Sequence, residues 1–122
     1  MIIFKIKDFL ELSRFEEDKT RRLTILSEKE GAKKIGGIFV IVPPKTPAVK
    51  YHYHKERESL ILIIKGKGKL VVEGKEYFVE EKELIYIPPM KKHKLENTGE
   101  TELRYLEFFT HPPVSADFIE VE

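Results

Sequence analysis

Short apolar runs separated by turn residues dominate the chain from Gly36 onward and constrain the fold more than any other feature. Each run is too short for a confident helix and is followed by prolines, a glycine or polar residues. Strands about 8 to 12 residues apart with such turns between them are typical of antiparallel sandwiches and barrels. The runs are Ile38–Val42, Leu60–Ile64, Leu70–Val72, Tyr77–Val79, Leu84–Ile87 and Leu103–Phe109. The sequence therefore predicts an all-β protein with an antiparallel barrel over residues 36–110.

Glycine and asparagine predict where the barrel turns. Gly74 lies between two apolar runs and predicts a hairpin, and Asn97 is expected to fix a turn through its side chain. Gly36 and Gly37 are expected to form a tight turn or a bulge. The segment Lys65–Lys69 lacks the spacing and the hydroxyl residue of a phosphate-binding loop, so we interpret it as a bulged turn with solvated lysines.

The two ends of the chain are less regular. Asp8–Leu12 fits a helical turn or a short strand, and Arg21–Leu26 has the pattern of a strand. Residues 1–35 are therefore expected to form an irregular N-terminal segment, and residues 111–122 a tail that packs along the outside. The chain has 122 residues and no linker or internal repeat, so residues 1–122 are expected to form one domain.

Composition and charge narrow the classes of function. The chain has 22 basic and 21 acidic residues, and its net charge of +1 gives no reason to expect a nucleic-acid or membrane partner. The N-terminus develops no secretory signal, so a cytoplasmic location is expected. The chain contains no cysteine, which excludes disulfides and thiolate metal ligands. It has no glutamine and one asparagine, a bias that is typical of thermophilic proteins.

Three of the four histidines lie in two places that indicate a shared site. His52 and His54 are two residues apart, and side chains with this spacing point to the same face of a strand. Neutral imidazole is a common ligand of divalent metal ions. Glu58 follows at a short interval, and His93 comes later, after a strand and a proline pair. These four residues are candidate metal ligands, and the alternative is that they are polar residues of the core or the surface.

The first histidine segment resembles the first motif of the cupin superfamily, whose members are small β-barrels with a metal site inside. That motif runs glycine, five residues, HxH, three or four residues, glutamate, six residues and glycine. Here His52, His54 and Glu58 fill it, but Gly66 closes it one residue late, and counting back from Gly66 puts Ser59 at the glutamate position. A one-residue slip reverses every face of a strand. Either Glu58 still reaches the metal, or Ser59 faces inward and the site consists of three histidines.

The second segment is similar to the second cupin motif, in which a PxG is followed after two residues by histidine and after three more by asparagine. Pro88, His93 and Asn97 fill it at the family's spacing, whereas Lys82 and Met90 stand where the family has glycine. The resemblance implies an antiparallel double-stranded β-helix, which is the cupin or jelly-roll barrel. It also implies one divalent metal ion per chain, with iron, manganese, zinc, nickel and copper all open.

The resemblance implies a metal-binding protein, and we expect a metal-dependent enzyme that acts on a small oxygenated metabolite such as a sugar, keto acid or diketone. Isomerase, dioxygenase and decarboxylase activities remain open. The alternative is a non-catalytic binding or sensor protein, because an enzyme needs an acid or base that faces the metal. Glu58, Tyr86 and Glu107 are the candidates for that role. A homodimer is expected, because the edges of a small barrel need covering.

Overall fold

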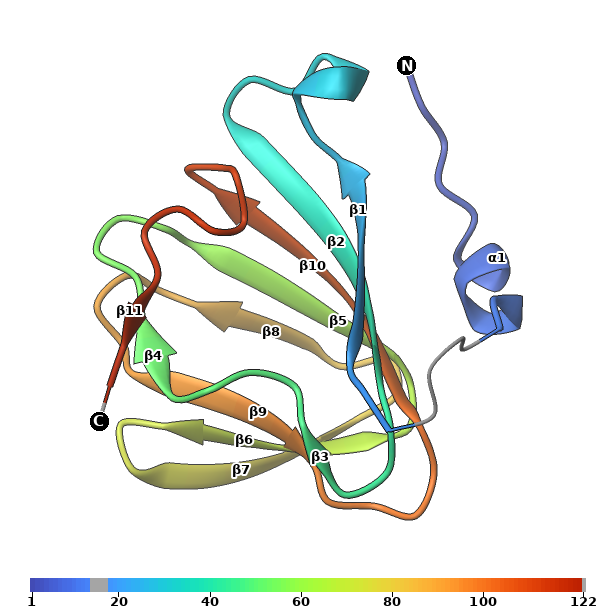
Figure 1. Ribbon diagram of the computed structural model, residues 1–122, viewed down its shortest axis with the longest axis vertical. Coiled ribbons are helices and arrows are strands. Elements are labelled where there is room, and N and C mark those ends of the chain that lie inside the picture. The colour runs from blue at the N-terminus through green and yellow to red at the C-terminus, as the bar shows by residue number, and fades with distance from the viewer. Residues whose placement is uncertain (14–17, 122) are drawn as a thin grey trace.

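The structure is a computed structural model, which describes residues 1–13 and 18–121. Two antiparallel sheets face each other (Figure 1). The five-stranded sheet has, in spatial order, β1 (Arg21–Leu26), β2 (Ile35–Val42), β10 (Leu103–Thr110), β5 (Ser59–Lys65) and β8 (Leu84–Ile87). The six-stranded sheet has β11 (Ile119–Glu120), β4 (His52–Tyr53), β9 (His93–Asn97), β6 (Lys67–Val72) and β7 (Lys75–Glu80), with β3 (Thr46–Pro47) beside β9. The described helices are α1 (Ile6–Glu11) and the 3₁₀ helix η1 (Glu28–Glu30).

The chain passes repeatedly from one sheet to the other. It leaves β4 of the six-stranded sheet for β5 of the five-stranded sheet, returns for the β6–β7 hairpin, and crosses again for β8, β9 and β10 in turn. Every strand pair among the described residues is antiparallel. This path is an antiparallel double-stranded β-helix, so the predicted fold class is confirmed.

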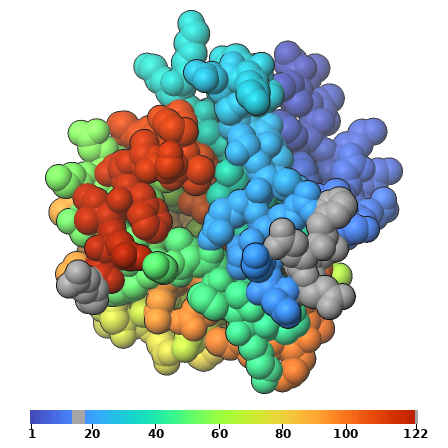
Figure 2. Space-filling model, in the orientation of Figure 1, coloured from blue at the N-terminus to red at the C-terminus, as the bar shows by residue number. Residues whose placement is uncertain are grey.

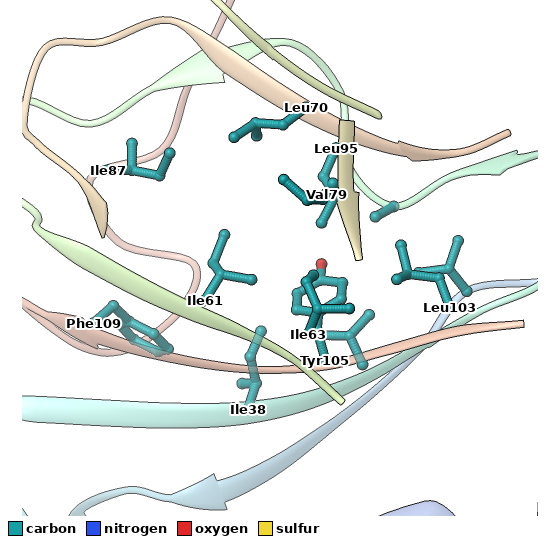
Figure 3. Packing of buried hydrophobic residues seen from close by; sticks show 13 residues of the cluster. Ile38, Ile61, Ile63, Leu70, Val79, Ile87, Leu95, Leu103, Tyr105 and Phe109 are labelled. Carbon is teal, nitrogen blue, oxygen red and sulfur yellow. The ribbon is translucent and has the colours of Figure 1, made fainter. Parts of the chain in front are cut away.

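The hydrophobic core lies between the two sheets. Side chains alternate along each strand, so Ile61 and Ile63 of β5 point inward beside Tyr105 of β10, opposite Leu70 and Leu95 of the six-stranded sheet (Figure 3). Ile63 has no exposed surface, and Leu95 keeps only 2%. Burying such side chains contributes about 1.5–3 kcal/mol each to folding.

The predicted hairpin turn at Gly74 has the backbone geometry that the sequence indicated. Glu73 and Gly74 join β6 to β7 with positive φ angles of 48° and 80°, which is the geometry of a tight hairpin turn. Lys82 and Met90, at the positions where the cupin motif has glycine, also adopt positive φ angles of 70° and 69°. The backbone conformation is therefore retained although both residues carry side chains.

Gly36 and Gly37 do not form a tight turn. The alternative of a bulge agrees with a register irregularity between β1 and β2, which lies between Thr24 and Leu26 opposite Gly37. Both glycines lie within β2 and pair with Phe109 and Phe108 of β10. A Cβ atom on either glycine would come within 2.8 Å of the ring of its partner. The two glycines therefore leave room for aromatic side chains of the neighbouring strand.

Part of the outer face of the five-stranded sheet is covered by α1. Phe9 of α1 packs on Phe39 of β2, with ring centroids 5.0 Å apart. Arg104 of β10 donates from Nη1 to the carbonyl oxygens of Phe9, Leu10 and Leu12 and fastens the end of the helix. Asp8–Leu12 is thus helical over most of its length. The strand predicted at Arg21–Leu26 is confirmed by β1. No helix in the described part of the chain is long and apolar enough to cross a membrane.

The C-terminal segment does more than pack along the outside, which corrects that expectation. Ile119 and Glu120 form β11 and pair with β4, the strand that carries His52 (Figure 1). The carboxylate of Asp117 accepts hydrogen bonds from the backbone N–H groups of residues 55–57 at 2.7–3.0 Å. This segment therefore forms one side of the barrel end that contains the histidines.

Asn97 fixes a turn, as predicted, and its loss should destabilise the barrel. Its Nδ2 donates to the carbonyl oxygens of Val42, Pro43 and Thr101, and its Oδ1 accepts from Gly99 N–H. We predict that Asn97→Ala lowers the free energy of unfolding by about 1–3 kcal/mol, because buried carbonyls lose their donor. Urea denaturation measures this, with the exposed Thr98→Ala as control. Equal midpoints for the two variants would contradict the assignment.

Candidate metal centre

Three buried imidazoles converge at one end of the barrel. His52 lies on β4 and pairs in register with His93, the first residue of β9, while His54 follows directly after β4. Each side chain is about 4% exposed. One ring nitrogen from each residue lies within 4.8 Å of the other two, and the part of the chain that is described contains no other such group of metal-binding side chains.

Backbone carbonyl groups orient all three rings. His52 Nδ1 lies 2.6 Å from the Lys50 carbonyl oxygen, His54 Nδ1 lies 2.5 Å from that of Asp117, and His93 Nδ1 lies 2.8 Å from that of Lys91. A carbonyl oxygen only accepts, so each Nδ1 must carry the proton and donate it. Each Nε2 is then left with a free lone pair. This is the arrangement that orients histidines in metal sites.

The distance between two of these nitrogen atoms is the one expected when both bind the same cation. His52 Nε2 and His54 Nε2 are 3.2 Å apart. Two acceptors at this distance repel each other unless a positive charge lies between them. Two imidazoles bound at about 2.0–2.1 Å to a tetrahedral zinc ion would place their nitrogens about 3.3 Å apart. The donor set therefore fits a divalent metal ion.

Burial keeps the rings neutral, which metal binding requires. Burial lowers the pKa of His52 to about 3, with a further contribution from the neighbouring His93. Burial also lowers the pKa values of His54 and His93. At neutral pH all three imidazoles are therefore free bases and can act as ligands.

Glu58 is not brought to the histidines. It is exposed just before β5, and its Oε1 accepts a 2.6 Å hydrogen bond from the hydroxyl of Tyr86 on the neighbouring strand. Ser59 faces inward instead and is only 2% exposed. Of the two registers that the sequence left open, the structure thus has the one in which the carboxylate points away. Tyr86 is exposed as well and does not face the site.

Glu107 is the one candidate acid or base that faces the histidine end of the barrel. Its side chain points into a cavity of about 580 Å³ whose wall also includes His52, His54 and His93. The remaining wall is mainly apolar, as in most small-molecule sites. The cavity is also bordered by Arg22 at its edge. The C-terminal segment in red, β1 in blue and residues 47–50 in green, all of which contribute to the wall, lie close together on the face shown in Figure 2.

Residues of the C-terminal segment complete the site, and the sequence patterns did not reveal them. The ring of Phe118 stacks on His52, with centroids 4.3 Å apart and planes 18° from parallel. Arg57 is 2% exposed and donates to five carbonyl oxygens in this segment, those of residues 110, 111, 113, 114 and 116. Neither residue belongs to a short motif, so no local signal distinguishes them from ordinary surface residues. His111 is exposed and lies outside the cluster.

The chain matches the model of the cupin domain over residues 38–109 and belongs to the cupin family. It is 30% identical over 125 residues to an uncharacterized protein of Aquifex aeolicus, an alignment that covers 100% of this chain and 99% of that protein. It is 33% identical over 70 residues to an uncharacterized protein of Methanocaldococcus jannaschii, covering 57% of this chain and 55% of that protein. It is 31% identical over 69 residues to a mannose-1-phosphate guanylyltransferase of Salmonella montevideo, covering 57% of this chain but only 14% of the enzyme.

Solved structures share the same fold. A protein of Klebsiella pneumoniae with a double-stranded β-helix domain has a TM-score of 0.77 at 16% identity, and the match covers 98% of this chain and 96% of that one. A polyketide cyclase of Streptomyces resistomycificus has a TM-score of 0.74 at 20% identity, with 91% and 86% covered. A sugar phosphate isomerase of Silicibacter pomeroyi has a TM-score of 0.65 at 21% identity, with 75% and 60% covered.

We predict that the purified, untagged protein contains close to one divalent metal ion per chain. His93→Ala should lower the metal affinity about tenfold or more, because it removes one of three converging nitrogens. Elemental mass spectrometry measures the metal content of each variant. Glu58→Ala is the control and should keep the wild-type content, since its carboxylate lies outside the cluster. Equal metal content in His93→Ala and the wild type would contradict the assignment.

The metal-free protein should lose stability as the pH falls. The folded-state pKa values of the three imidazoles lie below the ordinary value of about 6.5, so the unfolded chain takes up protons first. The stability gained from neutral histidines is complete above about pH 6.5 and is lost as the pH falls toward 3. Calorimetry at pH 7.5 and 5.0 should show a lower Tm at pH 5.0.

A matched pair of variants attributes that pH dependence to the buried cluster. His52→Gln should reduce the difference in Tm between the two pH values, because it removes the imidazole with the most strongly lowered pKa. His111→Gln, which changes an exposed histidine outside the cluster, should keep the wild-type difference. The same reduction in both variants would count against the role of burial.

Proposed function

We propose that this protein is a metal-dependent enzyme that binds a small oxygenated metabolite, such as a sugar, keto acid or diketone, in the barrel cavity. The observation that carries this proposal is the convergence of three unprotonated Nε2 atoms at the wall of a cavity of about 580 Å³. His52, His54 and His93 would hold one metal ion and leave its other positions open. Bound there, a divalent metal supplies a positive charge that attracts oxygen atoms and polarises a carbonyl group.

The charges around the cavity support a ligand with an acidic group. Lys19, Arg22, Lys50 and Arg57 line it together with the carboxylate of Glu107, and Lys50 forms an ion pair with Glu120. Arg57 is committed to carbonyl oxygens of the C-terminal segment. Arg22 donates from one Nη to the carbonyl oxygen of Ala48 and has further N–H groups that can face a ligand. A carboxylate or phosphate group on the metabolite would therefore meet Arg22 at the edge of the cavity.

The comparisons are consistent with an enzyme of this kind. Proteins of similar fold include a sugar phosphate isomerase and a polyketide cyclase. Their identity to this chain is below 25%, so the likeness supports the fold and leaves the reaction open. The homodimer, the cytoplasmic location and the thermophilic origin stay predictions.

Small bidentate oxygen compounds should stabilise the metal-loaded protein. A ligand that binds the native state alone raises the Tm by mass action, so oxalate, pyruvate and 2-oxoglutarate should shift the metal-loaded form and not the metal-free form. Differential scanning fluorimetry measures the shift. Arg22→Gln should reduce this shift. Arg21→Gln should not, because Arg21, whose register partner is Ile41, lies on the opposite face of the sheet. If no compound raises the Tm of either form, the proposal that the bound metal is accessible to ligands would be refuted.

Turnover separates an enzyme from a binding protein. A compound that shifts the Tm and is consumed, with both effects lost in His52→Ala, would establish catalysis. Shifts without consumption of any compound, with or without oxygen, would instead establish the non-catalytic binding or sensor protein.

A further inference from the structure

Glu107 is a carboxyl group inside an otherwise apolar part of the barrel wall. It lies on β10 between Tyr105 and Phe109, which both belong to the core cluster. Its register partners are Ile38 on β2 and Ile61 on β5, and these also face inward. Alternation along β10 therefore turns Glu107 toward the space between the two sheets, where Figure 3 shows the side chains of Tyr105 and Ile61.

No ion pair or regular hydrogen bond satisfies this carboxyl group among the residues that the structure describes. Ser59 lies close enough to lower the pKa of this group, although its hydroxyl has no partner in regular hydrogen-bond geometry. Arg57 and Arg22 lie close enough to act on it through their charge. The hydrogen bonds that these two guanidinium groups donate, however, go to backbone carbonyl oxygens.

Burial shifts this group toward its protonated form, and its neighbours oppose that shift. Burial raises the pKa of Glu107 above its ordinary value, while Ser59, Arg57 and Arg22 limit the rise. Burying a carboxyl group without a direct partner costs stability. Groups of this kind concentrate where a protein moves protons, because a raised pKa suits an acid or base that works near neutral pH.

The cavity connects Glu107 to the candidate metal centre. The same cavity is lined by His52, His54 and His93, and its volume of about 580 Å³ leaves room for a small metabolite between them. A ligand held by its oxygens at the histidines would therefore present its carbon atoms to this space. Glu58 and Tyr86, the other candidates, hydrogen-bond to each other on the outer surface and cannot reach it.

We propose that Glu107 is a catalytic acid–base residue that moves a proton to and from a carbonyl-bearing ligand in this cavity. The carboxylate takes a proton from the carbon next to the carbonyl group. The C–H electron pair becomes the C=C bond of an enolate, and the carbonyl π electrons move to oxygen. Glu107 then returns the proton to the same carbon. Where that carbon bears a hydroxyl group, Glu107 can instead deliver the proton to the former carbonyl carbon while the hydroxyl proton moves to the enolate oxygen. The hydroxyl oxygen then becomes the new carbonyl oxygen, and the product is an isomer. The step needs no oxidant or reductant, and it rests on the proposed function of the histidine centre.

Proton exchange with solvent tests this role directly. The metal-loaded protein is incubated in D₂O with pyruvate, 2-oxoglutarate, dihydroxyacetone phosphate and fructose 6-phosphate, and ¹H NMR follows the loss of signals next to each carbonyl group. We expect the wild type to exchange these protons in at least one compound. Glu107→Gln should slow this exchange by about 10²–10⁴-fold, which is the usual contribution of a general acid or base. Glu58→Gln is the matched control and should exchange like the wild type.

A second measurement does not depend on activity. In protein labelled with ¹³C at glutamate side-chain carboxyls, the Glu107 signal should titrate above the ordinary glutamate value of about 4.3. It should also move when a carbonyl compound that raises the Tm is added. Glu107→Asp, which keeps the acid but shortens it, assigns the signal and should retain part of the exchange rate.

The outcomes separate this inference from the proposed function. Absence of bound metal in the wild type would remove the proposed function. If metal and ligand bind but no compound exchanges, or if Glu107→Gln exchanges like the wild type, the role of Glu107 is overturned and the binding site stands. The role of Glu107 would also be overturned if its signal titrates in the ordinary range and does not shift when ligand is added.

Discussion

Arg57 and Asp117 join two segments that are 60 residues apart in the chain, and the histidine end of the barrel depends on their contacts. Asp117 holds the backbone N–H groups of residues 55–57, while the Arg57 guanidinium donates to five carbonyl oxygens of residues 110–116. A guanidinium can serve this many acceptors because it carries five donors in a fixed fork. These two sets of hydrogen bonds place the Asp117 carbonyl group against His54 and the ring of Phe118 against His52.

The interior of the barrel combines a packed core with a polar cavity, and single strands contribute to both. On β10, Leu103 is fully buried in the core, while Glu107, four residues later on the same face, lines the cavity. Most buried polar groups are satisfied, as Asn97 is by three carbonyls and a backbone N–H. Among the described residues, the Ser59 hydroxyl has no partner, and the three histidine Nε2 atoms converge on one point with free lone pairs. Groups left without partners in this way are expected where a protein binds a ligand or moves protons.

Local patterns predicted the strands and the shared face of His52 and His54, because alternation with a period of two follows from strand geometry alone. The spacing to Gly66 also pointed to Ser59 as the inward residue, and its burial agrees with that register. The tight turn expected as one alternative at Gly36 and Gly37 is absent. These glycines make room for Phe108 and Phe109, which are adjacent to them only after β2 and β10 pair.

The amino-acid sequence by itself determined the all-β class, the main turns and the set of histidines, since these depend on alternation, turn residues and motif spacing. The tertiary structure decided which carboxyl group faces those histidines. Glu58 and Glu107 are equally polar in sequence, yet the register of β5 and β10 turns Glu107 inward and leaves Glu58 bound to Tyr86 outside. Strand register between distant segments is set by packing across the whole barrel, and a shift of one residue would exchange the two faces.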